Sequence, residues 1–108
     1  MSDNIQMLLE ASNSINRNTV SFTRCLILAL LAYFVDGLQY RELKSALDIS
    51  DGKLASNLKP LKRLGYIRKE EVKLDRKRLD VYYLTQQGKR ELDKITKWTE
   101  IVQNVVGE

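Results

Sequence analysis

Polar and basic side chains gather on one side of the segment Ser50–Tyr66, which reads SDGKLASNLKPLKRLGY. Its leucines are spaced by four, three and three residues, the pattern of one buried helix face: Leu54, Leu58, Leu61 and Leu64. The exposed face carries polar and basic residues of the types that contact nucleic acid, and with the first residue of the segment they are Ser50, Lys53, Ser56, Asn57, Lys59, Lys62 and Arg63. Asn can bond the N6 and N7 atoms of adenine, and Lys can meet guanine or a phosphate. The chemistry predicted for these seven residues is therefore contact with nucleic acid.

The proline at position 60 stands inside this predicted helix. A proline in a helix interior removes a backbone hydrogen bond and costs about 3 kcal/mol. Burying the two leucines that follow it is worth roughly 1.5–3 kcal/mol each, which can offset that cost. Ser50 is a suitable N-cap, and Gly65 is suited to end the helix in a left-handed conformation. We therefore expect one bent helix over Asp51–Leu64.

A second group of cations lies in the segment KLDRKRL, between two segments rich in β-branched and aromatic residues. Tyr66–Val72 and Asp80–Thr85 are predicted to be strands, which makes the segment between them the exposed tip of a hairpin. Its cations gain nothing from one another, so we expect phosphate or minor-groove contacts from Lys73, Arg76, Lys77 and Arg78. Residues 53–90 hold 12 Lys and Arg against four Asp and Glu, a net charge of +8, while the rest carries −4. This segregation favours a nucleic-acid-binding surface, with double-stranded DNA as the partner that the family resemblance below implies.

Other classes of function are disfavoured by the composition. The chain has no His and one Cys, so we expect neither an enzyme nor a metal site, and no cofactor. Cys25 lies in an apolar run and is expected to be structural, because a sensor thiol needs exposure and a low pKa. That run, Cys25–Val35, is 11 residues long, against about 20 for a membrane span. The N-terminal residues lack the basic region of a secretory signal. We therefore expect a cytoplasmic protein with no membrane partner.

The remaining segments complete one domain over residues 1–108. A weakly amphipathic helix is expected over Asn4–Ile15 and a core helix over Ser21–Val35. A short extended segment follows at Leu38–Tyr40, and then a helix over Arg41–Leu47, which with the basic helix forms a helix-turn-helix. A last helix is expected over Gln86–Val106. The predicted class is α+β, mostly α: a winged helix with the helix-turn-helix at 41–64, the wing at 66–85, and flanking helices at 1–18 and 86–108.

At this point the sequence resembles the MarR/ArsR-type winged-helix regulators, and in particular the small prokaryotic and archaeal members. The resemblance covers about Leu26–Leu92 and rests on YRELKSALDISDGKLASNLKPLKRLGYI and DRKRLDVYYLTQQGKREL. It implies a DNA-binding dimer in which the basic helix enters the major groove and a wing arginine, matched by Arg78, reaches the minor groove. The chain departs from the family in having Arg76 within the wing motif, Asp48 where many relatives have Gly, and none of the Cys and His clusters of the metal sensors.

Both flanking helices have apolar faces that exceed what a winged helix needs. We expect them to form a homodimer interface through Ile5, Leu8, Leu9, Leu92, Ile95, Trp98, Val102 and Val105. Such a dimer carries two recognition helices for a pseudo-palindromic site. The favoured function is a sequence-specific transcription regulator. A non-specific chromatin-type DNA binder and a winged-helix module that docks proteins remain open, because fold alone does not decide function. The sequence identifies no effector.

Overall fold

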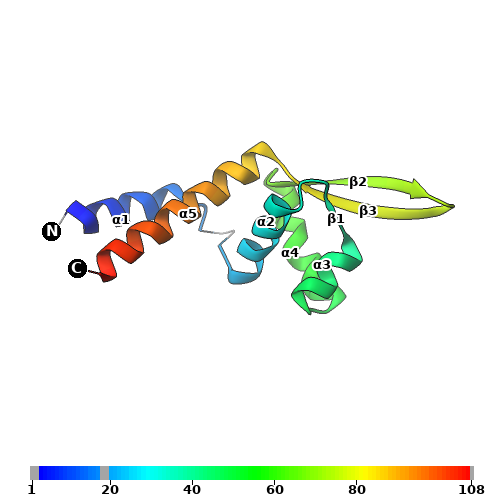
Figure 1. Cartoon of the computed structure of the whole chain (residues 1–108), viewed down its shortest axis with the longest axis horizontal. Helices are drawn as coiled ribbons and strands as arrows, with labels where there is room; N and C mark the ends of the chain where they lie inside the picture. The colour runs from blue at the N-terminus through cyan, green and yellow to red at the C-terminus, as the bar shows by residue number, and fades with distance from the viewer. Residues whose placement is uncertain (1–2, 18–19, 108) are drawn as a thin grey trace.

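The computed structural model describes residues 3–17 and 20–107, so the predicted boundary at residue 18 and both chain ends fall outside the described residues. Within these residues the chain is mostly helical, with a small sheet, as expected (Figure 1). The elements are α1 (Asp3–Ser14), α2 (Phe22–Tyr33), β1 (Leu38–Gln39), α3 (Tyr40–Leu47), α4 (Asp51–Arg63), β2 (Ile67–Leu74), β3 (Lys77–Leu84) and α5 (Gln86–Val106).

The three strands form an antiparallel sheet in the order β1-β3-β2. The pairing places Leu38 opposite Tyr82 and Ile67 opposite Leu84. Because side chains alternate across a strand, this register turns Ile67 and Tyr82 to the same face, and both are buried. The sheet thus has one face that packs on the helices, and it continues outward as a two-stranded hairpin, the wing.

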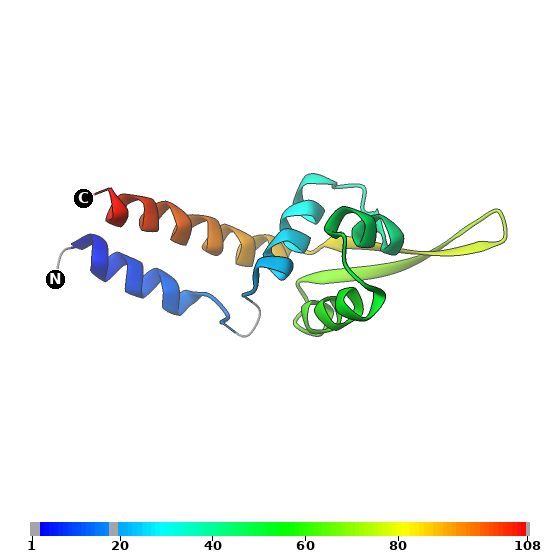
Figure 2. The same ribbon diagram turned by 90° about the horizontal axis from the view of Figure 1, so that it is seen from below.

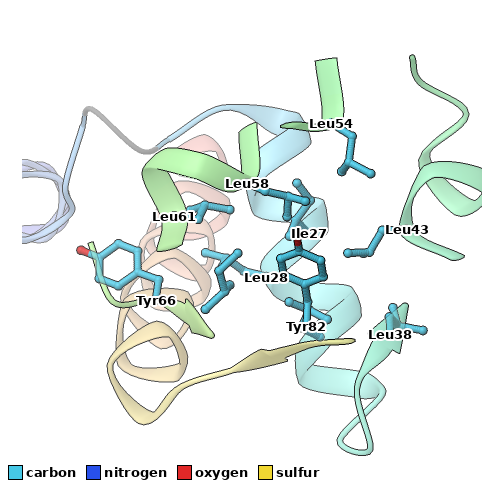
Figure 3. Close-up of a cluster of buried hydrophobic side chains, with 11 residues drawn as sticks. Ile27, Leu28, Leu38, Leu43, Leu54, Leu58, Leu61, Tyr66 and Tyr82 are labelled. Carbon is cyan, nitrogen blue, oxygen red and sulfur yellow. The ribbon is translucent and has the colours of Figure 1, made fainter. Parts of the chain in front are cut away.

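One cluster of apolar side chains joins α2, α3, α4 and the base of the sheet (Figure 3). α4 contributes three leucines to it, Leu54, Leu58 and Leu61, of which the first and last are 0% exposed. These are three of the four leucines that the spacing assigned to the core, and the fourth, Leu64, is half-buried and packs against the cluster. The cluster holds the helix-turn-helix against the sheet and leaves the other side of α4 in solvent.

The helix continues through Pro60, as predicted, and ends at Arg63. Ser50 is its N-cap: the side-chain oxygen accepts a hydrogen bond from the Lys53 N–H at 3.2 Å. At the other end, the N–H groups of Gly65 and Tyr66 bond the carbonyls of Lys62 and Leu61 at 3.0 Å each. Gly65 has a φ of 78°, so this is the left-handed ending that the glycine predicted.

The core helix α2 is less central than its apolar sequence predicted. Its residues Ile27, Leu28 and Leu31 are buried, whereas Phe22 and Tyr33 are 81% and 80% exposed. Only one side of this helix therefore packs on the apolar cluster.

α1 and α5 lie side by side and project away from the rest of the molecule, at the end opposite the wing (Figures 1 and 2). We call this pair the arm, and α2–β3 the body. The Cα radius of gyration is 16.2 Å, against about 13 Å for a compact domain of this length. The two flanking helices therefore pack on each other more than on the body.

Candidate nucleic-acid interface

The first turn of α4 is held against α3 by two polar contacts. The Tyr40 hydroxyl donates a hydrogen bond to the Asp51 carbonyl at 3.0 Å, and Lys44 Nζ lies 3.1 Å from Asp51 Oδ2. The carboxylate also lies where a helix N-terminus favours negative charge. These contacts fix the direction in which the exposed face of α4 points.

That face carries most of the residues that the sequence predicted for it. Lys53, Ser56, Lys59, Lys62 and Arg63 are all exposed. The Ser56 hydroxyl donates to the Lys53 carbonyl at 2.9 Å, which leaves its oxygen able to accept a further hydrogen bond. Base-edge contacts are therefore available from the first half of the helix and phosphate contacts from its lysines and arginine.

The side chain of Asn57, which was predicted to contact nucleic acid, makes hydrogen bonds within the protein. Its amide oxygen accepts a hydrogen bond from Arg24 Nε at 3.1 Å, and its amide nitrogen donates to the Lys53 carbonyl at 2.7 Å. Both atoms needed for a bidentate contact with adenine therefore already make one hydrogen bond within the protein, which restricts the orientation of the amide, although each atom keeps a second donor or acceptor position. Asn57 links α4 to Arg24 on α2, a partner that no spacing in the sequence indicates.

The wing differs from its predicted form. The segment KLDRKRL was expected to be the exposed tip of the hairpin, outside strands that end at Val72 and begin at Asp80. The strands instead pair as far as Leu74 and Lys77, and the turn consists of Asp75 and Arg76 alone. Both turn residues have positive φ values, 50° and 70°, the pattern of a type I′ turn, which normally favours Asn-Gly. The segment was not predicted to be strand because its charged side chains hide the apolar and polar alternation that marks a strand in a sequence.

Only Arg76 of the four predicted wing cations therefore lies in the turn. Lys73 and Arg78 lie directly opposite each other on paired strands, and Lys77 is opposite Leu74. Like charges in directly opposite positions destabilise a sheet, so an anion placed between Lys73 and Arg78 would relieve their repulsion. All four cations are exposed.

A continuous surface joins α4 to the wing through Tyr40. On one side, Tyr40 lines a hollow with Lys59, Lys62 and Tyr82. On the other side, it lines a second hollow with Arg41 and Arg78, in which Glu71 and Asp80 also lie. Tyr40 thus lies between cations of α4 and cations of α3 and β3, and the second group is interspersed with carboxylates. Arg41, at the start of α3, belongs to this second group and was missed because its neighbours predicted only a helix.

The residues predicted for a dimer interface lie mainly in the arm. Ile5 and Leu8 are half-buried along α1, while Leu9 is 49% exposed. On α5, Val102 and Val105 are half-buried. Leu92 instead packs against the core of the body.

Between the arm and α2 lies an apolar hollow lined in part by Phe22, Cys25, Ile95 and Trp98. Within the described residues, the buried Trp98 Nε1 has no hydrogen-bond partner. Burial raises the pKa of the Cys25 thiol, which disfavours the reactive thiolate and agrees with a structural role.

No helix in the described ranges is long and apolar enough to cross a membrane. In the same ranges, no three His, Cys, Asp or Glu side chains are grouped so that they could hold a metal ion.

A family model for a winged helix DNA-binding domain matches residues 23–102. No curated protein matches the chain significantly.

Several solved structures share the fold at low sequence identity. A mutant of MepR from S. aureus, bound to an oligodeoxyribonucleotide, is 21% identical with a TM-score of 0.72, over 95% of this chain and 75% of MepR. ZitR from Lactococcus lactis, a zinc-responsive MarR family member, is 18% identical with a TM-score of 0.62, over 82% and 59% of the two chains. A transcriptional regulator homologue from Pyrococcus horikoshii OT3 is 18% identical with a TM-score of 0.69, over 98% and 96%.

Proposed function

The chain belongs to the family of winged helix DNA-binding domains, and from this membership we propose that it is a cytoplasmic, MarR-like transcription regulator that binds double-stranded DNA as a homodimer. The observation that carries the proposal is the set of exposed cations on α4 and on the wing: Lys53, Lys59, Lys62, Arg63, Arg76 and Arg78. Tyr40 lines a hollow with Lys59 and Lys62 and another with Arg41 and Arg78, where Glu71 and Asp80 also lie. An exposed helix beside a basic hairpin can place side chains on base edges and phosphates of one duplex.

In this proposal α4 reads the major groove with its first half. Lys53 and Ser56 are exposed there, and the exposed Gly52 and Ala55 are small enough to allow close approach to bases. Lys59, Lys62 and Arg63 then contact phosphates, which position the helix but carry no sequence information. Arg76 and Arg78 contact the backbone or the adjacent minor groove.

The arm supplies the argument for a dimer. Within its full described range, Asp3–Ser14, α1 has no buried residue. Met7 and Leu9 are 49% exposed and Val106 is 78% exposed. Two helices alone bury too little apolar surface to hold such an arm in water, whereas the arms of two chains together make a four-helix bundle. We therefore propose that a second copy covers the arm and gives the dimer two recognition helices.

One observation favours the non-specific alternative. Because Asn57 is engaged by Arg24 and by its own helix, α4 presents fewer base-reading groups than its sequence suggests. If the remaining contacts are mostly to phosphates, the protein binds duplex DNA of any sequence.

Selection of bound duplexes from a random pool, at physiological salt, distinguishes the two. A specific dimer is expected to enrich an inverted repeat whose half-sites lie about 10 base pairs apart, one turn of the double helix. Enrichment without a shared motif would favour the non-specific binder, and no enrichment over a pool carried through without protein would contradict DNA binding.

A further inference from the structure

Two sequence features that lie far apart in the chain meet at one place in the fold. The turn that ends α4, Gly65–Tyr66, packs against the start of α5. The Thr85 N–H donates a hydrogen bond to the Tyr66 carbonyl at 3.1 Å, and the Thr85 hydroxyl donates to the Gly65 carbonyl. A Cβ at Gly88 would lie 2.0 Å from the same Tyr66 carbonyl oxygen, so only glycine allows this approach. The exit of α4 is thereby fixed to the first turn of α5.

One turn further along α5, Glu91 adds a second set of contacts. Its side chain is 4% exposed. Oε2 accepts a hydrogen bond from the Tyr66 hydroxyl at 3.2 Å, and Oε1 accepts one from the Asn16 N–H at 2.9 Å. Lys94 Nζ lies 4.0 Å from Oε2. Both oxygens of this buried carboxylate are therefore used, and they hold two separate segments.

The three segments that meet at Glu91 belong to both parts of the molecule. Tyr66 follows the recognition helix, Asn16 lies between α1 and α2, and Glu91 itself lies on the helix that continues into the arm. Figure 3 shows the Tyr66 ring at the margin of the core, with its hydroxyl turned away from the other labelled side chains. We call Tyr66, Glu91 and Asn16 the joint.

Because the arm is long, a small rotation at the joint produces a large displacement at the far end of α5. From Glu91 to Val106 the helix runs for about 22 Å, at 1.5 Å per residue. A rotation of about 10° at the joint displaces the far end by roughly 4 Å, which is close to the 3.4 Å rise of one base pair along a strand. In a dimer held together by the arms, such a rotation shifts one recognition helix by about one base pair relative to the other.

We propose that Glu91 is a positioning residue for DNA binding: by holding Tyr66 and Asn16 together, it fixes the angle between α4 and the arm, and so the half-site spacing that the dimer accepts. The proposal rests on the function proposed above for its consequence at DNA. The fixed angle itself is a property of one chain and can be measured without DNA.

The first test measures this angle as a distance within one chain. Spin labels are placed at Ala55→Cys on α4 and Gln103→Cys on α5, in a Cys25→Ala background, and mixed with excess unlabelled chain so that only intrachain distances contribute. A narrow distribution is expected for the parent protein and a broader one for Tyr66→Phe and Glu91→Ala. Leu38→Ala, which lies across the core from Tyr66 (Figure 3), lowers stability without touching the joint and should leave the distribution narrow.

If the distance distribution of the parent protein were as broad as that of Tyr66→Phe, the proposal that the joint fixes this angle would be wrong. Equal broadening by Leu38→Ala would contradict it as well. Tyr66→Phe removes only a hydroxyl, so the test remains decisive even where Glu91→Ala does not fold.

The second test measures affinity for a duplex with both selected half-sites, with one half-site, and with the spacing changed by one or two base pairs. For Tyr66→Phe, the advantage of the full site over the half-site should fall by about 2- to 30-fold, with half-site affinity unchanged. The preference for one spacing should weaken as well, which a loss of stability alone would not produce. An equal loss on full and half sites would contradict the positioning role. If the parent protein shows the narrow distance distribution but binds no duplex, the proposed function is wrong, whereas the conclusion that the joint fixes the angle between α4 and the arm remains valid.

Discussion

The body and the arm differ in how much of their apolar surface each covers for itself. In the body, Ile27, Leu43, Leu54 and Leu61 are 0% exposed. In the arm, the described part of α1 has no buried residue, and beyond Glu91 only Ile101 of the described α5 residues is buried. The body thus buries its core side chains completely within one chain, whereas the arm leaves much of its apolar surface uncovered. In the proposed function, the body contacts DNA and the arm, whose apolar surface is left uncovered within one chain, is where a second copy packs.

The largest effect is expected from a charge placed on the unfinished surface. Leu9→Glu puts a carboxylate on the exposed face of α1 that a second copy would cover. An unpaired buried charge should cost about 3–5 kcal/mol of dimerisation free energy, and the body should remain folded. Sedimentation at micromolar concentration checks this, with Glu10→Gln as a control on the same helix. A variant that stays dimeric would place the interface elsewhere.

A truncation in the body should act differently. Leu54→Ala removes a fully buried side chain and should lower the free energy of unfolding by about 2–5 kcal/mol. Because the core lies within one chain, the loss should not depend on protein concentration, in contrast to that of Leu9→Glu. Urea unfolding curves recorded at two protein concentrations measure this loss of unfolding free energy. A concentration-dependent loss would mean that the body also depends on the partner.

Within the DNA-binding face, Lys53 and Asn57 should behave differently. Lys53→Ala should cost about 1–3 kcal/mol on the selected site and relax discrimination at one base pair. Asn57→Ala removes the partner of Arg24, so its smaller loss should be nearly equal on all sequences. A competition assay on the site, its single-base variants and random duplex separates the two. If Asn57→Ala alone abolished discrimination at one adenine, its amide would be a base reader after all.

The smallest effect on stability is expected at the turn of the wing. Arg76 has a φ of 70°, a conformation that costs a residue with a Cβ about 1–2 kcal/mol. Arg76→Gly should therefore raise the free energy of unfolding by up to about 1 kcal/mol, after the greater entropy of glycine in the unfolded chain is counted. The same variant should bind duplex DNA less tightly, because one phosphate contact is lost. If Arg76→Gly bound duplex DNA more tightly than the parent protein, Arg76 would not contact the DNA.

The elements followed from local patterns in the sequence. The leucine spacing of α4, its Ser50 cap and Gly65 at its end predicted a helix that continues past Pro60, and the structure confirms it. Thr85 likewise caps α5, whose predicted bounds are those observed. These features depend on neighbours within a few residues, which a single sequence displays.

The features that the sequence did not reveal depend on long-range contacts. Strand pairing through Lys73 and Arg78 is imposed by the two-residue turn and the register, and charged side chains conceal the alternation. The engagement of Asn57 by Arg24 joins residues 33 positions apart. The burial of Glu91 arises only where the end of α4, the α1–α2 connection and α5 meet. Residue type and spacing therefore predicted which residues share the exposed face of α4, but not the contacts that each of them makes within the protein.

The most direct test of the central claim compares lysines of the body and of the arm in one titration. Affinity of the parent protein for its selected duplex is measured at several salt concentrations, beside a Lys59→Ala and Lys62→Ala double variant and a Lys97→Ala control on α5. Each phosphate neutralised contributes about −0.9 to the slope of log K against log salt. A steep slope is predicted for the parent, a slope shallower by about two for the double variant, and the parent slope for Lys97→Ala. A flat slope for the parent, or an equal change from the arm lysine, would contradict the assignment of DNA binding to the body.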